Sequence, residues 1–150
     1  FVTVGTPNTR DNNVDYSQVY TALTEICKVN LKGKMIIMRS TMPPMTTSDI
    51  VIPFLENETS MKCGDAFALA TCPERILEGQ AVKELHDIPE IIGGVNDISN
   101  QIATELFLKI NLPSINSSFS YLGRFFPTFK LDVSKSLYNF ELYLFRWYYY

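Results

Sequence analysis

Two carboxylates stand four positions apart in a short polar segment of this chain, residues 71–79. Glu74 and Glu78 follow an apolar, alanine-rich run that is typical of a buried strand. Pro73 restricts the backbone directly before Glu74. General acid–base catalysis requires a carboxylate that is held still at such a place. Both carboxylates could equally be solvated loop residues, and the sequence leaves that alternative open.

Two other strand-like runs, residues 1–4 and 35–38, also end in polar segments that contain hydroxyl groups and proline. These segments contain Gly5, Thr6, Pro7, Ser40 and Thr41. Ligands of open α/β sheets bind outside the carboxyl ends of the strands, so we expect one crevice to collect all three segments. The alternatives are a structural turn at the first segment and a helix cap at the second.

Composition restricts the possible partners. The chain has 150 residues, 46% of them hydrophobic and 19% charged, which is typical of one globular domain. A net charge of −3 without a cluster of Lys or Arg argues against nucleic acid and anionic membranes as partners, and no apolar run is long enough to cross a bilayer. Cys27, Cys63 and Cys72 have no paired spacing, which indicates reduced, structural thiols of a cytoplasmic protein and no metal site.

The periodicity of apolar residues predicts alternating strands and helices. We expect strands near residues 1–5, 34–39, 66–72 and 90–93, and helices near 16–32, 46–57 and 97–110. This alternation predicts parallel βαβ units. The expected fold class is therefore α/β, a partial Rossmann-type doubly wound parallel sheet. His86, the sole histidine, lies in a polar stretch and is expected at the surface.

Four motifs, in this order and spacing, resemble the UDP-sugar (nucleotide-sugar) 6-dehydrogenase family over roughly residues 1 to 110. They are Val4-Gly5-Thr6-Pro7 with Asp15 downstream, Ser40-Thr41-x-Pro-Pro, Pro73-Glu74-Arg75-x-x-x-Gly79, and Ile91-Ile92-Gly93-Gly94. Arg75 resembles the branch that oxidises UDP-N-acetylhexosamines such as UDP-N-acetylmannosamine. Glu78 looks more like the glucose-oxidising branch, so a UDP-glucose 6-dehydrogenase stays an alternative.

The resemblance implies an NAD-binding domain and a two-step oxidation of a sugar C6 alcohol to a carboxylate. In that family a cysteine thiolate captures the aldehyde, and water cleaves the resulting thioester. It also implies a UDP-sugar substrate, a homo-oligomeric parent enzyme and a place in polysaccharide biosynthesis.

The resemblance also assigns roles to individual residues. Cofactor contacts are implied at Val4, Gly5, Thr6, Pro7, Ser40, Thr41 and Glu78. Glu74 and Thr41 would be catalytic, with Glu74 as the acid/base of thioester hydrolysis, and Glu74, Arg75 and Glu78 would contact the substrate. Arg75 could instead form a structural ion pair with either glutamate.

The departures from the family divide the chain into two expected parts. The glycine-rich first turn would precede Phe1, which suggests a fragment, and no cysteine matches the catalytic motif. We expect residues 1–111 to be the second half of an NAD-binding Rossmann-type domain. Residues 112–150 contain no alanine and many aromatic side chains, and we expect an irregular or weakly helical, aberrant tail produced by a frameshift near residues 111–113. Without the missing parts, the chain could be an inactive remnant or a nucleotide- or protein-binding module.

Overall fold

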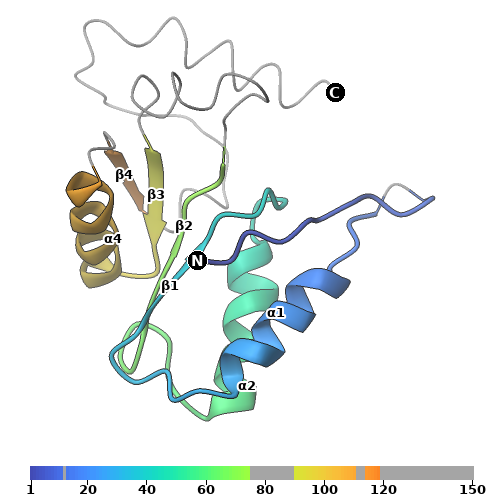
Figure 1. The fold of residues 1–150 in the computed structure, drawn as a ribbon, viewed down its shortest axis with the longest axis horizontal. Coiled ribbons are helices and arrows are strands. Elements are labelled where there is room, and N and C mark those ends of the chain that lie inside the picture. Colours follow the sequence, from blue (N-terminus) through green and yellow to red (C-terminus); the bar gives the residue numbers. More distant parts are fainter. Residues whose placement is uncertain (12, 75–89, 111–113, 119–150) are drawn as a thin grey trace, which may run out of the picture.

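The structure is a computed structural model that describes residues 1–11, 13–74, 90–110 and, for the backbone alone, 114–118 (Figure 1). Its helical elements are α1 (Ser17–Cys27), the π-helical stretch η1 (Thr47–Val51), α2 (Ile52–Thr59) and α4 (Asp97–Lys109). Its strands are β1 (Met35–Met38), β2 (Ala68–Thr71), β3 (Glu90–Gly94) and β4 (Ser114–Ser118). The predicted strands near 34–39, 66–72 and 90–93 and the helix near 97–110 are confirmed.

The four strands form one sheet in the order β1-β2-β3-β4. β1 pairs parallel with β2, and β3 pairs parallel with β4. β2 and β3 run antiparallel, so the expectation of an all-parallel sheet is wrong and the sheet is mixed. Apolar periodicity could not reveal this, because a strand buried on both faces has the same pattern whichever way its neighbour runs.

The N-terminal segment lies beside β1 as an isolated parallel bridge between Val2 and Met38. The Val2 N–H donates to the Ile37 carbonyl at 2.8 Å, and the Arg39 N–H donates to the Val2 carbonyl at 2.8 Å. The predicted first strand is thus confirmed in its place and direction, but its ladder is shorter than residues 1–5. It still brings the end of this segment to the end of β1.

Helices cover both faces of the sheet (Figure 1). On one face, Ile36, Met38 and Leu69 are buried in a cluster with side chains of α1 and α2. On the other face, Ile37 and Ala70 belong to a second cluster that includes Ala103 and Phe107 of α4. Successive residues of β1 alternate between the two clusters, as a strand requires. Fully burying one such aliphatic side chain contributes about 1.5–3 kcal/mol, so both layers hold the sheet in place.

Helix α1 ends earlier than the predicted residue 32. The N–H groups of Lys28 and Val29 donate to carbonyls three residues earlier, at 3.2 and 3.3 Å, which tightens the last turn. Gly33, predicted as the left-handed cap of this helix, has a φ of 70° but lies in the turn before β1, where its N–H donates to the Ala66 carbonyl. Gly33 therefore starts the strand rather than ending the helix.

The expectation of an irregular segment after residue 111 is wrong for residues 114–118. These five residues form β4, which continues the sheet beyond β3 through the right order of strand, helix α4 and strand. Residues 119–150, the predicted boundary at 111–113, and the helical turn expected near residues 81–86 lie outside the described residues. The frameshift origin of the tail stays a prediction.

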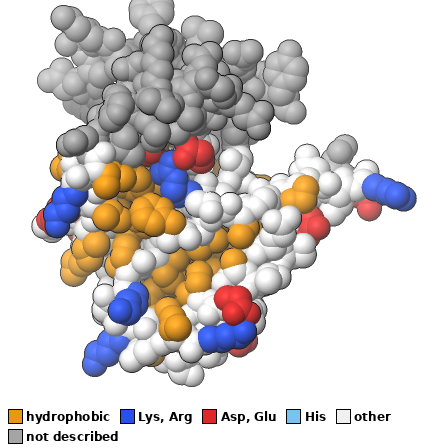
Figure 2. Space-filling view, in the orientation of Figure 1, with side chains coloured by type: hydrophobic (Ala, Val, Ile, Leu, Met, Phe, Trp, Pro, Cys, Tyr) orange, Lys and Arg blue, Asp and Glu red, His pale blue; other side chains and the backbone are white. Residues whose placement is uncertain are grey.

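One face of the described region carries apolar surface. Figure 2 shows hydrophobic side chains gathered in the middle of this view, where Figure 1 places the N-terminus. Phe1 itself is 64% exposed, although its ring makes an edge contact with Phe107. Apolar surface of this kind is typical of regions that contact further protein. Among the described helices, none has the length and hydropathy needed to cross a membrane.

Gly94→Ala should destabilise the fold, because the end of β3 passes very close to the first turn of α4. An added Cβ would lie 2.4 Å from the Asn100 nitrogen and 2.8 Å from the Ser99 carbonyl carbon, both backbone atoms. We expect the free energy of unfolding to fall by about 1–3 kcal/mol in urea denaturation. Gly5→Ala is the control, since its Cβ would meet only the flexible Gln18 side chain at 3.3 Å. Equal stability of Gly94→Ala and the unmodified chain would contradict this packing.

Candidate functional site

The three polar segments singled out from the sequence lie side by side at the carboxyl ends of the parallel strands. The backbone ladder of β1 and β2 continues past both strands into these segments. The Cys72 N–H donates to the Met38 carbonyl at 2.8 Å, and the Glu74 N–H donates to the Arg39 carbonyl at 3.1 Å. The expected gathering of the segments at one edge of the sheet is what the structure has.

Hydroxyl groups tie the first two segments together. The buried Ser40 hydroxyl donates to the Val4 carbonyl at 2.7 Å, and the Thr6 hydroxyl donates to the Thr41 carbonyl. Both hydroxyls therefore hold the loops in place. Thr41 is exposed, and its side chain has no hydrogen bond to another described residue. Of the predicted hydroxyl contacts, Thr41 is the one that is placed to meet a ligand.

Gly5 and Pro7 are exposed next to this pair of loops. The Gly5 N–H accepts no special geometry from its φ, and donates to the Gln18 amide oxygen at 3.2 Å. The fold does not require glycine here, because an added Cβ would meet only that flexible side chain. A glycine without a structural need is compatible with close approach of a ligand to the backbone.

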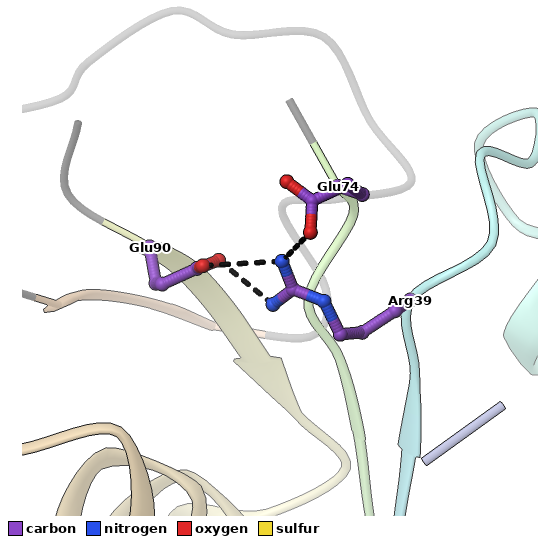
Figure 3. Close-up of polar contacts among 3 residues, drawn as sticks. All are labelled: Arg39, Glu74 and Glu90. Atoms are coloured by element: carbon purple, nitrogen blue, oxygen red, sulfur yellow. Dashed lines mark hydrogen bonds and ion pairs between the residues drawn. The ribbon is translucent and has the colours of Figure 1, made fainter. Parts of the chain in front are cut away.

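Glu74 does not stand alone at the end of β2. Arg39, the residue that follows β1, donates from Nη2 to the Glu74 carboxylate (Figure 3). The same guanidinium grips Glu90 at the start of β3, from Nη1 to Oε2 at 3.0 Å and from Nη2 to Oε1 at 3.1 Å. Such a two-bond arrangement between Arg and a carboxylate adds geometric specificity to the attraction. One cation thus joins the ends of three strands.

The antiparallel register explains why the two carboxylates meet. β2 and β3 pair Ala70 with Gly94 and Thr71 with Gly93. Continuing this register places Glu90 directly across from Glu74. Like charges opposite each other destabilise a sheet, so a cation is needed between them. Arg39 supplies it from the neighbouring strand.

Burial differs strongly within this Arg39–Glu74–Glu90 cluster. The side chains of Arg39 and Glu90 are 10% and 9% exposed, whereas that of Glu74 is 43% exposed. The guanidinium carbon also lies 5.5 Å from the centre of the Phe107 ring, within range of a cation–π contact. Arg39 and Glu90 therefore form a fixed, buried base, and Glu74 is the member that a ligand can reach.

The carboxylates keep Arg39 charged despite its burial. Burial is the largest single influence and would lower the pKa of Arg39, but the hydrogen bonds to Glu90 and Glu74 together outweigh it and raise the pKa. Cys72, at the end of β2, responds in the opposite sense to ionisation. Burial, together with the charge of Glu90, raises the pKa of the Cys72 thiol to about 12.

The other two cysteines are not activated either. Burial and the charge of Glu56 raise the pKa of Cys63 to about 11, and burial also raises the pKa of Cys27. All three are free thiols, and Cys72 is fully buried, as the sequence predicted. A nucleophilic or metal-binding cysteine needs a lowered pKa. None of the three therefore has the environment of a nucleophile.

Several predicted site residues lie outside the described residues, namely Arg75, Glu78 and His86. Arg39 and Glu90 were missed by the sequence interpretation. A signal was present, because each charged residue directly adjoins a buried strand and the two have opposite signs. Pairing them required the direction of β3, which the sequence pattern did not reveal.

Comparisons with known proteins agree on the family. Residues 1–111 match the family described as UDP-glucose/GDP-mannose dehydrogenase family, NAD binding domain. A UDP-N-acetyl-D-mannosamine dehydrogenase of Methanococcus aeolicus is 33% identical over 144 residues, which cover 92% of this chain and 32% of that protein. This alignment extends beyond residue 111, where the family match ends. A GDP-mannose 6-dehydrogenase of Pseudomonas aeruginosa is 28% identical over 123 residues, covering 79% of this chain and 28% of that protein.

The fold agrees with solved structures as well. The crystal structure of an NDP-N-acetyl-D-galactosaminuronic acid dehydrogenase from Methanosarcina mazei matches with a TM-score of 0.73 at 28% identity. The match covers 79% of this chain and 26% of that one. The chain thus spans about a third of the length of the curated relatives that it matches.

Cys72 should resist alkylation in the native protein. With a pKa of about 12 instead of 9.0, its thiolate fraction near neutral pH is about a thousandfold lower than that of a free thiol, and the side chain is also buried. Peptide mass spectrometry after brief iodoacetamide treatment should show Cys27 labelled well before Cys72. In denaturant all three should react alike, which serves as the control. Equally fast labelling of native and unfolded Cys72 would contradict the buried site.

Proposed function

We propose that this chain, which belongs to the UDP-glucose/GDP-mannose dehydrogenase family, supplies the NAD-binding domain of an enzyme that oxidises a UDP-N-acetylhexosamine. The reaction would convert the C6 alcohol of UDP-N-acetylmannosamine to the uronic acid, for polysaccharide biosynthesis in the cytoplasm. The observation that carries the proposal is the position of Glu74. It lies at the end of β2, beside the loops of Ser40 and Val4, where an acid/base can meet both cofactor and substrate.

The cofactor of this family domain is NAD, which accepts a hydride from the substrate carbon. The exposed loop edge fits the nicotinamide half of such a ligand, because Gly5 permits a close approach and Thr41 offers an unused hydroxyl. In this proposal Val4, Gly5, Thr6 and Pro7 hold the cofactor by their backbone. Ser40 keeps that loop in place, and Thr41 lies next to the reacting carbon.

Glu74 is the proposed general acid/base. Its exposed carboxylate can exchange a proton with water or substrate, while Arg39 fixes its direction. Arg75 and Glu78 are proposed to contact the sugar nucleotide, and Glu78 also the cofactor. A homo-oligomeric parent enzyme is part of the same proposal.

Relatives of differing specificity leave the sugar as a proposal. The Methanococcus protein is named for UDP-N-acetyl-D-mannosamine, and the Pseudomonas protein for GDP-mannose. Arg75 after the Pro-Glu pair supports the first of these, and Glu78 supports UDP-glucose as the alternative substrate.

A specific observation favours a second candidate function, a nucleotide-binding module without complete catalysis. The chain's three cysteines all have raised pKa values and none is activated for covalent catalysis. The thiol chemistry of the full reaction would then have to come from outside this chain. By itself, the chain is expected to be inactive.

A chimera tests the proposed function. Residues 1–111 can replace the aligned segment of the Methanococcus UDP-N-acetyl-D-mannosamine dehydrogenase, and NADH formation is followed with UDP-N-acetylmannosamine, UDP-glucose and GDP-mannose. We expect the first substrate to be turned over fastest. Glu74→Gln in this chimera should lower kcat by about a hundredfold or more, the scale of a lost acid/base.

Glu58→Gln is the matched control, because Glu58 is an exposed carboxylate of α2, and it should leave kcat unchanged. A folded chimera that reduces NAD with none of the three sugars would count against the proposed enzyme. If that chimera still bound NAD in calorimetry, the binding-module alternative would be favoured. Full activity of Glu74→Gln would remove Glu74 from the catalytic role.

A further inference from the structure

The Arg39–Glu74–Glu90 cluster is more elaborate than charge balance alone requires. Glu90 already satisfies the guanidinium with two hydrogen bonds, at 3.0 and 3.1 Å, and is as deeply buried as Arg39 itself. The bond from Arg39 to Glu74 is an additional one, directed outward from this pair. It links the buried pair to the carboxylate that is exposed at the edge of the sheet.

We propose that Arg39 is a positioning residue that holds the Glu74 carboxylate in one orientation at the ligand-facing edge, with Glu90 and Phe107 fixing Arg39 in turn. This inference rests on the proposed acid/base role of Glu74. It adds a residue outside the four family-like motifs and outside the contacts assigned above.

Glu74 would otherwise have little to restrain it. Its side chain is 43% exposed, and a glutamate of this kind samples several rotamers in water. Arg39 cannot follow such motion, because Glu90 holds both of its terminal nitrogens and the Phe107 ring lies 5.5 Å from its guanidinium carbon. The backbone bond from the Glu74 N–H to the Arg39 carbonyl fixes the distance between the two residues. A rigid donor at a fixed distance selects one carboxylate position.

The geometry also explains why the cation is an arginine. Arg39 must face Glu90 with two parallel donors and still reach Glu74 with Nη2. A planar fork with five N–H donors can do both, whereas a lysine ammonium is a single point of charge. Arg39→Lys should therefore keep a cation in the cluster but lose the orientation of Glu74.

The test follows the titration of Glu74 in the chain itself, by NMR of carboxyl-labelled glutamate assigned with Glu74→Gln. Removal of the cation should make Glu74 easier to protonate. Because Arg39→Gln alone leaves Glu90 buried without a partner, the comparison is between Arg39→Gln/Glu90→Gln and Glu90→Gln. We expect the Glu74 midpoint to be higher by about one pH unit in the double variant, as for an opposite charge lost at contact distance.

Lys28→Met is the control, since it removes an exposed cation paired with Glu25 at the end of α1, and it should not move the Glu74 midpoint. An unchanged midpoint in the Arg39 variants would overturn the inference. In a chimera that reduces NAD, Arg39→Lys should lower kcat about tenfold at an unchanged KM for NAD, and an unchanged kcat would likewise overturn it. An inactive chimera would contradict the proposed function, while the titration would still decide whether Arg39 holds Glu74.

Discussion

Two carboxylates face each other across the junction of β2 and β3, and the cation of Arg39 lies between them (Figure 3). The rest of this edge depends on that arrangement. An antiparallel β3 necessarily begins where β2 ends, so Glu90 comes to lie beside Glu74. Without the guanidinium, Glu90 would be a buried charge without a counter-ion, which costs several kcal/mol. The mixed sheet and the position of the candidate acid/base are thus two results of one electrostatic constraint.

The same constraint connects the two hydrophobic layers to the site. Arg39 directly follows β1, whose Ile37 side chain packs with Phe107 of α4, and the guanidinium lies over that same ring. On the other side of Arg39, Ser40 binds the Val4 carbonyl and so holds the N-terminal loop. Strand β1 therefore carries core packing, the cation and the loop contact within a few consecutive residues. Rigid packing below the edge is what allows an exposed carboxylate above it to keep one position.

Much of this edge could be predicted from the sequence. Apolar runs that end in polar, proline-containing segments located the loops of Thr6, Thr41 and Glu74, and parallel neighbours brought them together. The direction of β3 could not be predicted, because burial on both faces of Ile92 and its neighbours fits either direction. The Arg39–Glu90 pair depends on that direction and was missed with it. β4 was missed because the polar composition of Ser114–Ser118 lacks the apolar pattern of a strand, and pairing with β3 overrides that local preference.

The most direct measurement of the central constraint is a double-mutant cycle on Arg39 and Glu90, read as the free energy of unfolding in urea. Arg39→Met should cost about 3–5 kcal/mol, because it leaves Glu90 charged and buried, 9% exposed, without its partner. Adding Glu90→Gln to that variant should restore part of the loss, since it removes the uncompensated charge. Glu74→Gln should cost about 1 kcal/mol or less, because Glu74 is largely exposed. Additive effects of the Arg39 and Glu90 substitutions, or an Arg39→Met variant as stable as the unmodified chain, would contradict the account.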